Sequence, residues 1–102
     1  MTTRTAILVI DDLHKSRTRA EIQVQASEVA ENHNLVLQHT ICAPNPDLAA
    51  VLEYVSVHNI AVIITPSLGH IKGNAAWVLS RCDLITLTPP SLQRRRERLV
   101  VK

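Results

Sequence analysis

Phenylalanine is absent from this 102-residue chain, which has one tyrosine, Tyr54, and one tryptophan, Trp77. The absence excludes an aromatic core, so the core must be built from valine, isoleucine, leucine and alanine. This aliphatic composition favours helices packed on a parallel sheet. So few aromatic side chains also cannot alternate with the basic residues to stack on nucleic-acid bases. The length suggests a single domain.

Other shortages narrow the class of protein. The only two cysteines, Cys42 and Cys82, lie far apart and form no Cys-x-x-Cys motif. No signal peptide and no apolar run of membrane length is present. We therefore expect a cytoplasmic protein with reduced thiols, no membrane partner and no cofactor. The formal net charge of +2 is too small to indicate nucleic-acid binding by itself.

The stretch from Ile60 to Gly73 organises the chain. It begins with an apolar run, Ile60–Ile64, that shows no alternation of polar and apolar residues. Such a run is typical of a strand buried on both faces, which predicts a central strand of a mostly parallel sheet. Thr65 and Pro66 end the run, and a polar loop follows. That loop lies at the carboxyl edge of the sheet, formed by the C-terminal ends of the parallel strands, where open α/β folds bind ligands.

Local signals on either side predict the remaining elements. Thr18 and Glu21 form a capping box before one helix, Asp47 caps a second, and Asn74 caps a short third helix. Further strands are predicted at residues 6–10, 35–41 and 84–87. The fold class is therefore α/β, a three-layer doubly wound (flavodoxin-like) sheet of four to five mostly parallel strands.

The C-terminal residues are expected to lie outside this domain. We assign residues 1–90 to the α/β domain and residues 91–102 to a basic C-terminal tail. Ser91 is a candidate N-cap for one or two helical turns that reach Arg98. The following Leu99–Val101 segment is interpreted either as a short edge strand or as a frayed end.

Basic residues next to the carboxyl edge suggest an anion or DNA site. The alternative interpretation is a solvated basic rim followed by a soluble tail. The candidates are Lys15, Arg17, Arg19, His70, Lys72, Arg94, Arg95, Arg96 and Arg98.

Two kinds of chemistry receive less support from the same edge. Asp11, Asp12, His14 and His70 are possible metal ligands, but their spacing matches no recognised ligand pattern, and loop carboxylates also serve as turn and cap residues. We therefore predict no metal. Ser16 and Ser67 lack a local activating motif, and we predict no catalytic residue.

Three stretches resemble the catalytic domain of serine recombinases, the resolvase and invertase family. They are Glu21–Gln25, Asn45–Leu52, and Val62–Ile64 with the Ser67–Ile71 loop. The resemblance implies the fold over roughly residues 6–87. It also implies that Gln23 matches a family active-site residue.

The chemical positions of that family differ here. Asp11 lies in the region of the nucleophilic serine, and His70 and Gly73 replace the phosphate-binding arginines. An arginine clamp stabilises the charge of the transition state, so its loss argues against catalysis. The resemblance thus predicts a non-catalytic binding or regulatory protein, associated either weakly and nonspecifically with DNA or with a protein partner. The homodimer is predicted separately: a modest core without phenylalanine leaves an apolar surface, around Trp77 or at an edge strand, for a second copy to cover.

A second resemblance provides the alternative. Residues 7–12, with the acidic pair Asp11 and Asp12, look like the first strand of a response-regulator receiver domain. Thr65, however, stands where the phosphoacceptor aspartate is expected. The alternative function is therefore a degenerate receiver-like module for signalling or protein interaction.

Overall fold

A five-stranded sheet forms the centre of the computed structural model, which describes residues 4–14, 17–71 and 73–95. The strand order is β2-β1-β3-β4-β5, and every neighbouring pair is parallel except β4 and β5. The predicted α/β class with a mostly parallel sheet is confirmed. The elements in chain order are β1 (Arg4–Asp11), α1 (Arg19–Asn32), β2 (Leu35–Ala43), α2 (Leu48–Val57), β3 (Val62–Thr65), the 3₁₀ helix η1 (Leu68–Ile71), α3 (Ala75–Leu79), β4 (Asp83–Leu87) and β5 (Pro90–Gln93).

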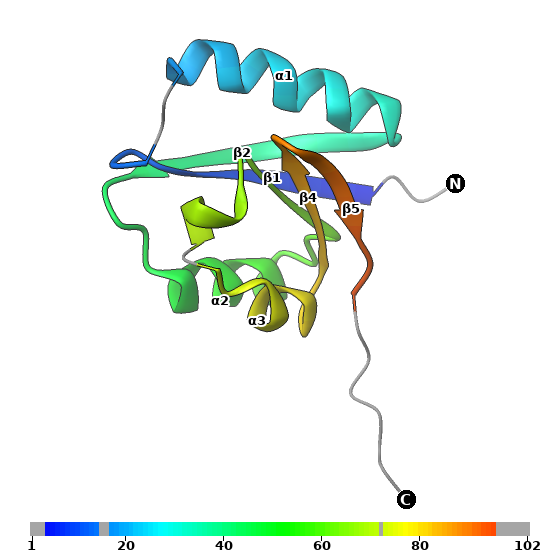
Figure 1. Ribbon diagram of the computed structural model, residues 1–102. Coiled ribbons are helices and arrows are strands. Elements are labelled where there is room, and N and C mark those ends of the chain that lie inside the picture. The colour runs from blue at the N-terminus through cyan, green and yellow to red at the C-terminus, as the bar shows by residue number, and fades with distance from the viewer. Residues whose placement is uncertain (1–3, 15–16, 72, 96–102) are drawn as a thin grey trace, which may run out of the picture.

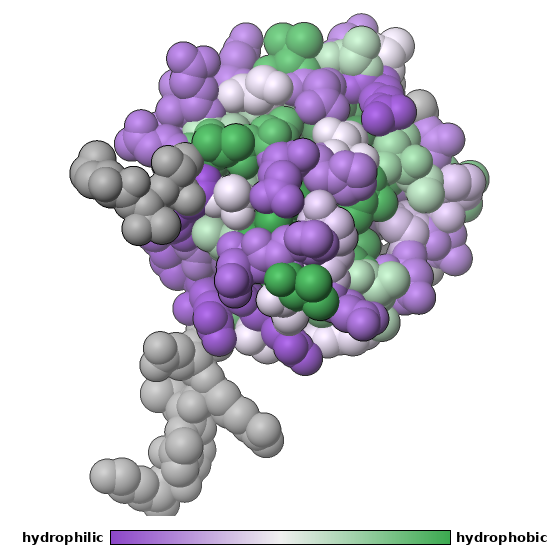
Figure 2. All heavy atoms as spheres, turned by 180° about the vertical axis from the view of Figure 1, so that it is seen from behind, coloured by the Kyte–Doolittle hydropathy of each residue, from purple (hydrophilic) through white to green (hydrophobic). Residues whose placement is uncertain are grey.

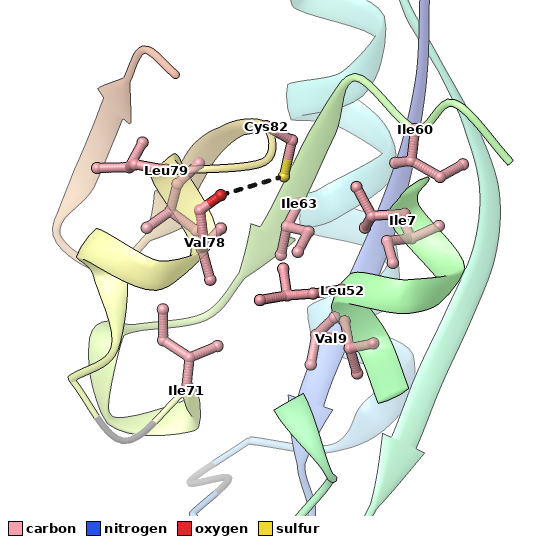
Figure 3. Packing of buried hydrophobic residues seen from close by; sticks show 12 residues of the cluster. Ile7, Val9, Leu52, Ile60, Ile63, Ile71, Val78, Leu79 and Cys82 are labelled. Carbon is pink, nitrogen blue, oxygen red and sulfur yellow. Dashed lines mark hydrogen bonds between the residues drawn. The ribbon is translucent and has the colours of Figure 1, made fainter. Parts of the chain in front are cut away.

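Helices cover both faces of the sheet. Helix α1 lies over one face, and α2 and α3 lie over the other (Figure 1). Alternate residues of β1 therefore enter different cores: Leu8 and Ile10 pack with Ile22 of α1, whereas Ile7 and Val9 pack with residues of α2 and α3. Figure 3 shows the second of these cores, in which the thiol of Cys82 donates to the Val78 carbonyl. The unbroken apolar runs arise because both faces are buried.

The helix boundaries follow the predicted caps at most positions. The Thr18 hydroxyl accepts a hydrogen bond from the Glu21 N–H at 3.2 Å, and the Asp47 carboxylate accepts one from the Ala49 N–H at 3.0 Å. Asn74 occupies the N-cap position of α3, but its side chain makes no capping hydrogen bond. The strands β1 and β2 extend beyond their predicted ends, to Asp11 and Ala43 respectively.

The helical turns predicted from Ser91 are wrong where the structure describes them. Residues 90–93 form β5, which pairs antiparallel with β4 in the register Leu84↔Gln93. The hydroxyls of Thr86 and Ser91 lie 2.5 Å apart across this pair. All five β4 residues are buried. Hydrogen bonds to the open edge of this buried strand therefore stabilise the segment more than a short, solvated helix would. Residues 91–93 thus belong to the sheet, while Leu99–Val101 lie outside the described residues.

The surface mixes polar and apolar residues. Figure 2 shows hydrophobic side chains lying between hydrophilic ones on the side opposite to the view of Figure 1. Across the described ranges, no helix combines the length and the apolar character needed to cross a bilayer.

Both cysteines are free: Cys42 is partly exposed and Cys82 is buried. Burial raises the pKa of the Cys82 thiol to about 12, which indicates a packing role rather than a reactive one.

Candidate functional site

Asp11 joins three loops at the carboxyl edge. One of its carboxylate oxygens accepts hydrogen bonds from the backbone N–H groups of Leu13 and Asn45, each at 3.0 Å. Burial opposes ionisation of this carboxyl, but these two donors, together with the imidazoles of His14 and His70, outweigh it and hold its pKa below the ordinary 3.8. Asp11 therefore fixes the loop between β2 and α2 against the end of β1.

His70 also contacts the end of β1, through a hydrogen bond with the backbone of Asp11. The backbone N–H of Asp11 donates to His70 Nδ1 at 2.9 Å, so the proton of the neutral ring lies on Nε2. The side chain is buried, and this burial, followed by the charge of His14, lowers the pKa of His70 although Asp11 acts in the opposite direction. His70 is therefore a neutral donor near pH 7. It lies between β1 and β3, where the strand order reverses and doubly wound folds bind ligands.

The first of two hollows beside His70, here called the β3 cleft, opens on the α1 side of the sheet. It has a volume of about 530 Å³. Its polar lining residues come from three separate loops and are His14, Arg17, Ser67, His70 and Thr88; Ile22 and Pro66 complete the wall.

Two contacts hold the β3 cleft together. Arg17 Nη2 donates to Gln25 Oε1 at 2.5 Å, which keeps the guanidinium against α1. The Thr88 N–H donates to the Pro66 carbonyl at 2.8 Å, which ties the loop after β4 to the loop after β3. A methyl group added at Gly69 would lie 3.7 Å from the Ser67 hydroxyl and 4.0 Å from His14 Nδ1, so the loop backbone passes close to both groups.

The second hollow, here called the α2 cleft, has a volume of about 350 Å³ and a different character. Most of its lining residues are apolar, although polar atoms make up the larger share of its exposed wall. Trp77 is 45% exposed there, and Asn45, Asp47 and Asn74 contribute polar groups. His70 is the residue that both clefts share. No arginine or lysine lines the α2 cleft among the residues described.

The predicted basic cluster is divided between two opposite edges of the sheet. Because β5 runs antiparallel, it carries Arg94 and Arg95 to the amino edge, away from His70. There the Arg95 N–H donates to the Asp83 carboxylate at 2.6 Å, and Arg94 lies 3.7 Å from the same carboxylate. The interpretation of Arg94 and Arg95 as neighbours of the carboxyl edge is therefore wrong.

The remaining predicted site residues lie at different places in the structure. Arg17 and His70 share the β3 cleft, whereas Arg19 is exposed at the start of α1 and does not line it. Gln23 accepts a hydrogen bond from the Thr40 hydroxyl at 2.8 Å, so it faces β2. Four other candidates lie outside the described residues: Lys15, Lys72, Arg96 and Arg98.

The residues considered for metal ligation and for nucleophilic attack are placed as follows in the described part of the chain. In the described ranges, no three histidine, cysteine or acidic side chains converge on a point that could hold a metal ion. The buried Thr65 hydroxyl donates to the Val9 carbonyl at 2.9 Å, which engages the position expected for a receiver phosphoacceptor. Ser67 lines the β3 cleft, while Ser16 lies outside the described residues.

Sequence reasoning missed two contributors to these walls. These are Thr88 in the β3 cleft and Trp77 in the α2 cleft, neither of which the sequence marks as a site residue. The available signal for Thr88 was a hydroxyl directly after the predicted strand at residues 84–87, since parallel strand ends meet at one edge. No local signal marks the α2 cleft, because its wall combines residues from four separate segments.

Comparison with protein-family models, curated proteins and solved structures finds no match to this chain. The resemblances to serine recombinases and to receiver domains therefore stay predictions.

Proposed function

We propose that this domain is a non-catalytic binding or regulatory module that holds an anionic group, a phosphate, in the β3 cleft. The observation that carries the proposal is the convergence of Arg17, Ser67, His70 and Thr88 on one hollow at the strand-order reversal. A guanidinium, two hydroxyls and a neutral imidazole supply the donors that phosphate oxygens need.

The absence of catalysis is part of the proposal. The carboxylate of Asp11, in the region of the recombinase nucleophile, is engaged by two backbone N–H groups. Arg17 is the sole arginine that lines the β3 cleft within the described ranges. One guanidinium supports binding of a phosphate, but it provides little of the charge stabilisation that phosphoryl transfer requires.

DNA is one carrier of such a phosphate. Arg94 and Arg95 lie at the opposite edge, so the β3 cleft offers contacts to only a few backbone phosphates. We therefore propose weak, nonspecific DNA association, in which the logarithm of the binding constant falls with that of the salt concentration at a slope of about −1 to −2. The alternative is a degenerate receiver-like interaction module, in which the carboxyl edge contacts a protein and not a phosphate.

The test compares two arginine variants that lie two residues apart. Titration with inorganic phosphate and with a short DNA duplex at low salt should show binding by the wild-type protein. Arg17→Gln should weaken the binding at least tenfold, because it removes the cation of the β3 cleft. Arg19→Gln, at an exposed position outside the cleft, is the matched control and should bind within about twofold of wild type. Equal binding by both variants, or none by wild type, would reject the proposal.

A further inference from the structure

The α2 cleft and the β3 cleft meet at one residue. Their walls share His70, and they open on opposite faces of the sheet at the same carboxyl edge. The Nε2 atom of His70, which carries the ring proton, has no hydrogen-bond partner among the described residues. No fully buried side-chain polar atom of this part of the chain is unpaired, so Nε2 retains some exposure to solvent although His70 as a whole is buried. A donor is thus available between the two hollows.

The two walls suit different chemical groups. The β3 cleft presents Arg17, His14 and two hydroxyls, which favour an anion. The α2 cleft presents Asp47 and no arginine or lysine within the described ranges, which disfavours an anion there. Its volume of about 350 Å³ lies within the range of small-molecule pockets.

The α2 cleft has the features of a site for a flat heterocycle. The half-exposed indole of Trp77 offers a stacking surface, and aliphatic side chains such as Val9 and Leu48 form the adjoining wall. The amides of Asn45 and Asn74 each provide a donor and an acceptor, which match the mixed donors and acceptors on the edge of a nucleobase.

We propose that the two clefts together bind a nucleoside monophosphate, with the phosphate in the β3 cleft, the base against Trp77 in the α2 cleft and His70 between them. This inference rests on the proposed function, because it names the molecule that carries the phosphate. Joining the base to the phosphate makes the second contact intramolecular, so the joined ligand binds more tightly than either part.

The experiment uses the full chain and three probes: adenosine 5′-monophosphate, adenosine and inorganic phosphate. Trp77 is the only tryptophan, so its fluorescence reports occupancy of the α2 cleft without a label. The monophosphate should bind at least about tenfold more tightly than either part and should change the fluorescence. Phosphate alone should bind without that change.

Variants separate the two clefts when calorimetry measures the binding. Arg17→Gln should lower the affinity for the monophosphate to that for adenosine, and Trp77→Leu should lower it to that for phosphate. Val57→Ala, at a position of α2 that is 68% exposed and lines neither cleft, should bind like wild type. Circular dichroism should show that each variant is folded like the wild-type protein.

The possible failures are distinguishable. Phosphate and monophosphate binding with equal affinity and no fluorescence change would overturn the two-cleft ligand while the proposed phosphate function survives. Binding of adenosine and the monophosphate that is insensitive to Arg17→Gln would also overturn it, because the α2 cleft would then act alone. If the wild-type protein binds neither inorganic phosphate nor the monophosphate, both proposals are rejected.

Discussion

Asp11 acts as a structural acid in this fold. Its carboxylate engages the Leu13 and Asn45 N–H groups, so the loop that lines the α2 cleft depends on it. Asp11 is buried, whereas Leu13 and Asn45 are exposed, so the stabilisation comes from two hydrogen bonds to a charged acceptor, which are stronger than bonds between neutral groups. Replacement of Asp11 by alanine would therefore loosen the edge on which both clefts are built.

The pH dependence of folding tests this role. The pKa of Asp11 is lowered on folding, so its stabilisation is complete above about pH 4, the ordinary value, and is lost as the pH falls through the folded pKa. Asp11→Asn should lower the free energy of unfolding by about 1–3 kcal/mol at pH 7, and by progressively less below about pH 4. Urea unfolding at several pH values measures both quantities.

His70 provides the comparison within the same measurements. Its lowered pKa makes the folded state lose stability as the pH falls below 6.5, a range in which Asp11 remains ionised. The wild-type curve should therefore decline in two ranges, and the lower range alone should be missing in Asp11→Asn. A constant difference between wild type and variant from pH 7 to pH 3 would contradict the role assigned to the Asp11 charge.

At the scale of elements, the amino edge is held by Asp83. This residue begins β4, and its carboxylate accepts hydrogen bonds from the Arg4 side chain at 2.8 Å and from the Arg95 N–H at 2.6 Å. These contacts link the start of β1 with the residues after β5. Arg94 adds a longer and more exposed ion pair to the same carboxylate.

Replacing each partner should separate these contributions. Asp83→Ala should lower the free energy of unfolding by about 2–4 kcal/mol, because it removes a nearly buried acceptor and leaves the Arg95 N–H without its partner. Arg94→Gln should cost less than about 0.5 kcal/mol, since an exposed ion pair contributes little. Urea denaturation measures both, and equal costs would show that Asp83 does not anchor β5.

At the scale of the whole molecule, self-association stays a prediction. Strand β2 is an edge strand of nine residues, and its Val36 is 51% exposed. An edge strand of this length with an exposed apolar side chain is a ready surface for pairing with a second copy.

We therefore expect a dimer in sedimentation experiments over a range of protein concentrations. Val36→Lys should shift the equilibrium toward monomer, because like charges meet across the paired edges. Val24→Lys, at an exposed position of α1, serves as the control and should leave the dimer unchanged. A wild-type protein that sediments as a monomer at the highest concentration would reject the prediction.

Local patterns in the sequence were sufficient for most of the architecture. The apolar runs of β1 and β3 specified strands buried on both faces, because burial of both faces removes the alternation of polar residues. The side chains of Thr18 and Asp47 specified helix starts, because each accepts a hydrogen bond from an N–H group two or three residues away. Such signals depend only on neighbouring residues, so they can be recognised in the sequence before the rest of the structure is known.

Tertiary structure decided the direction of β5 and the composition of the two clefts. The segment after Pro89 had local signals for a helix. It forms a strand because pairing with the otherwise open edge of β4 stabilises it more than a short helix would. That reversal carried Arg94 and Arg95 to the edge opposite His70. The contact between the Asp11 N–H and His70 spans 59 residues of sequence, so only the folded sheet brings the two together, and no local pattern records it.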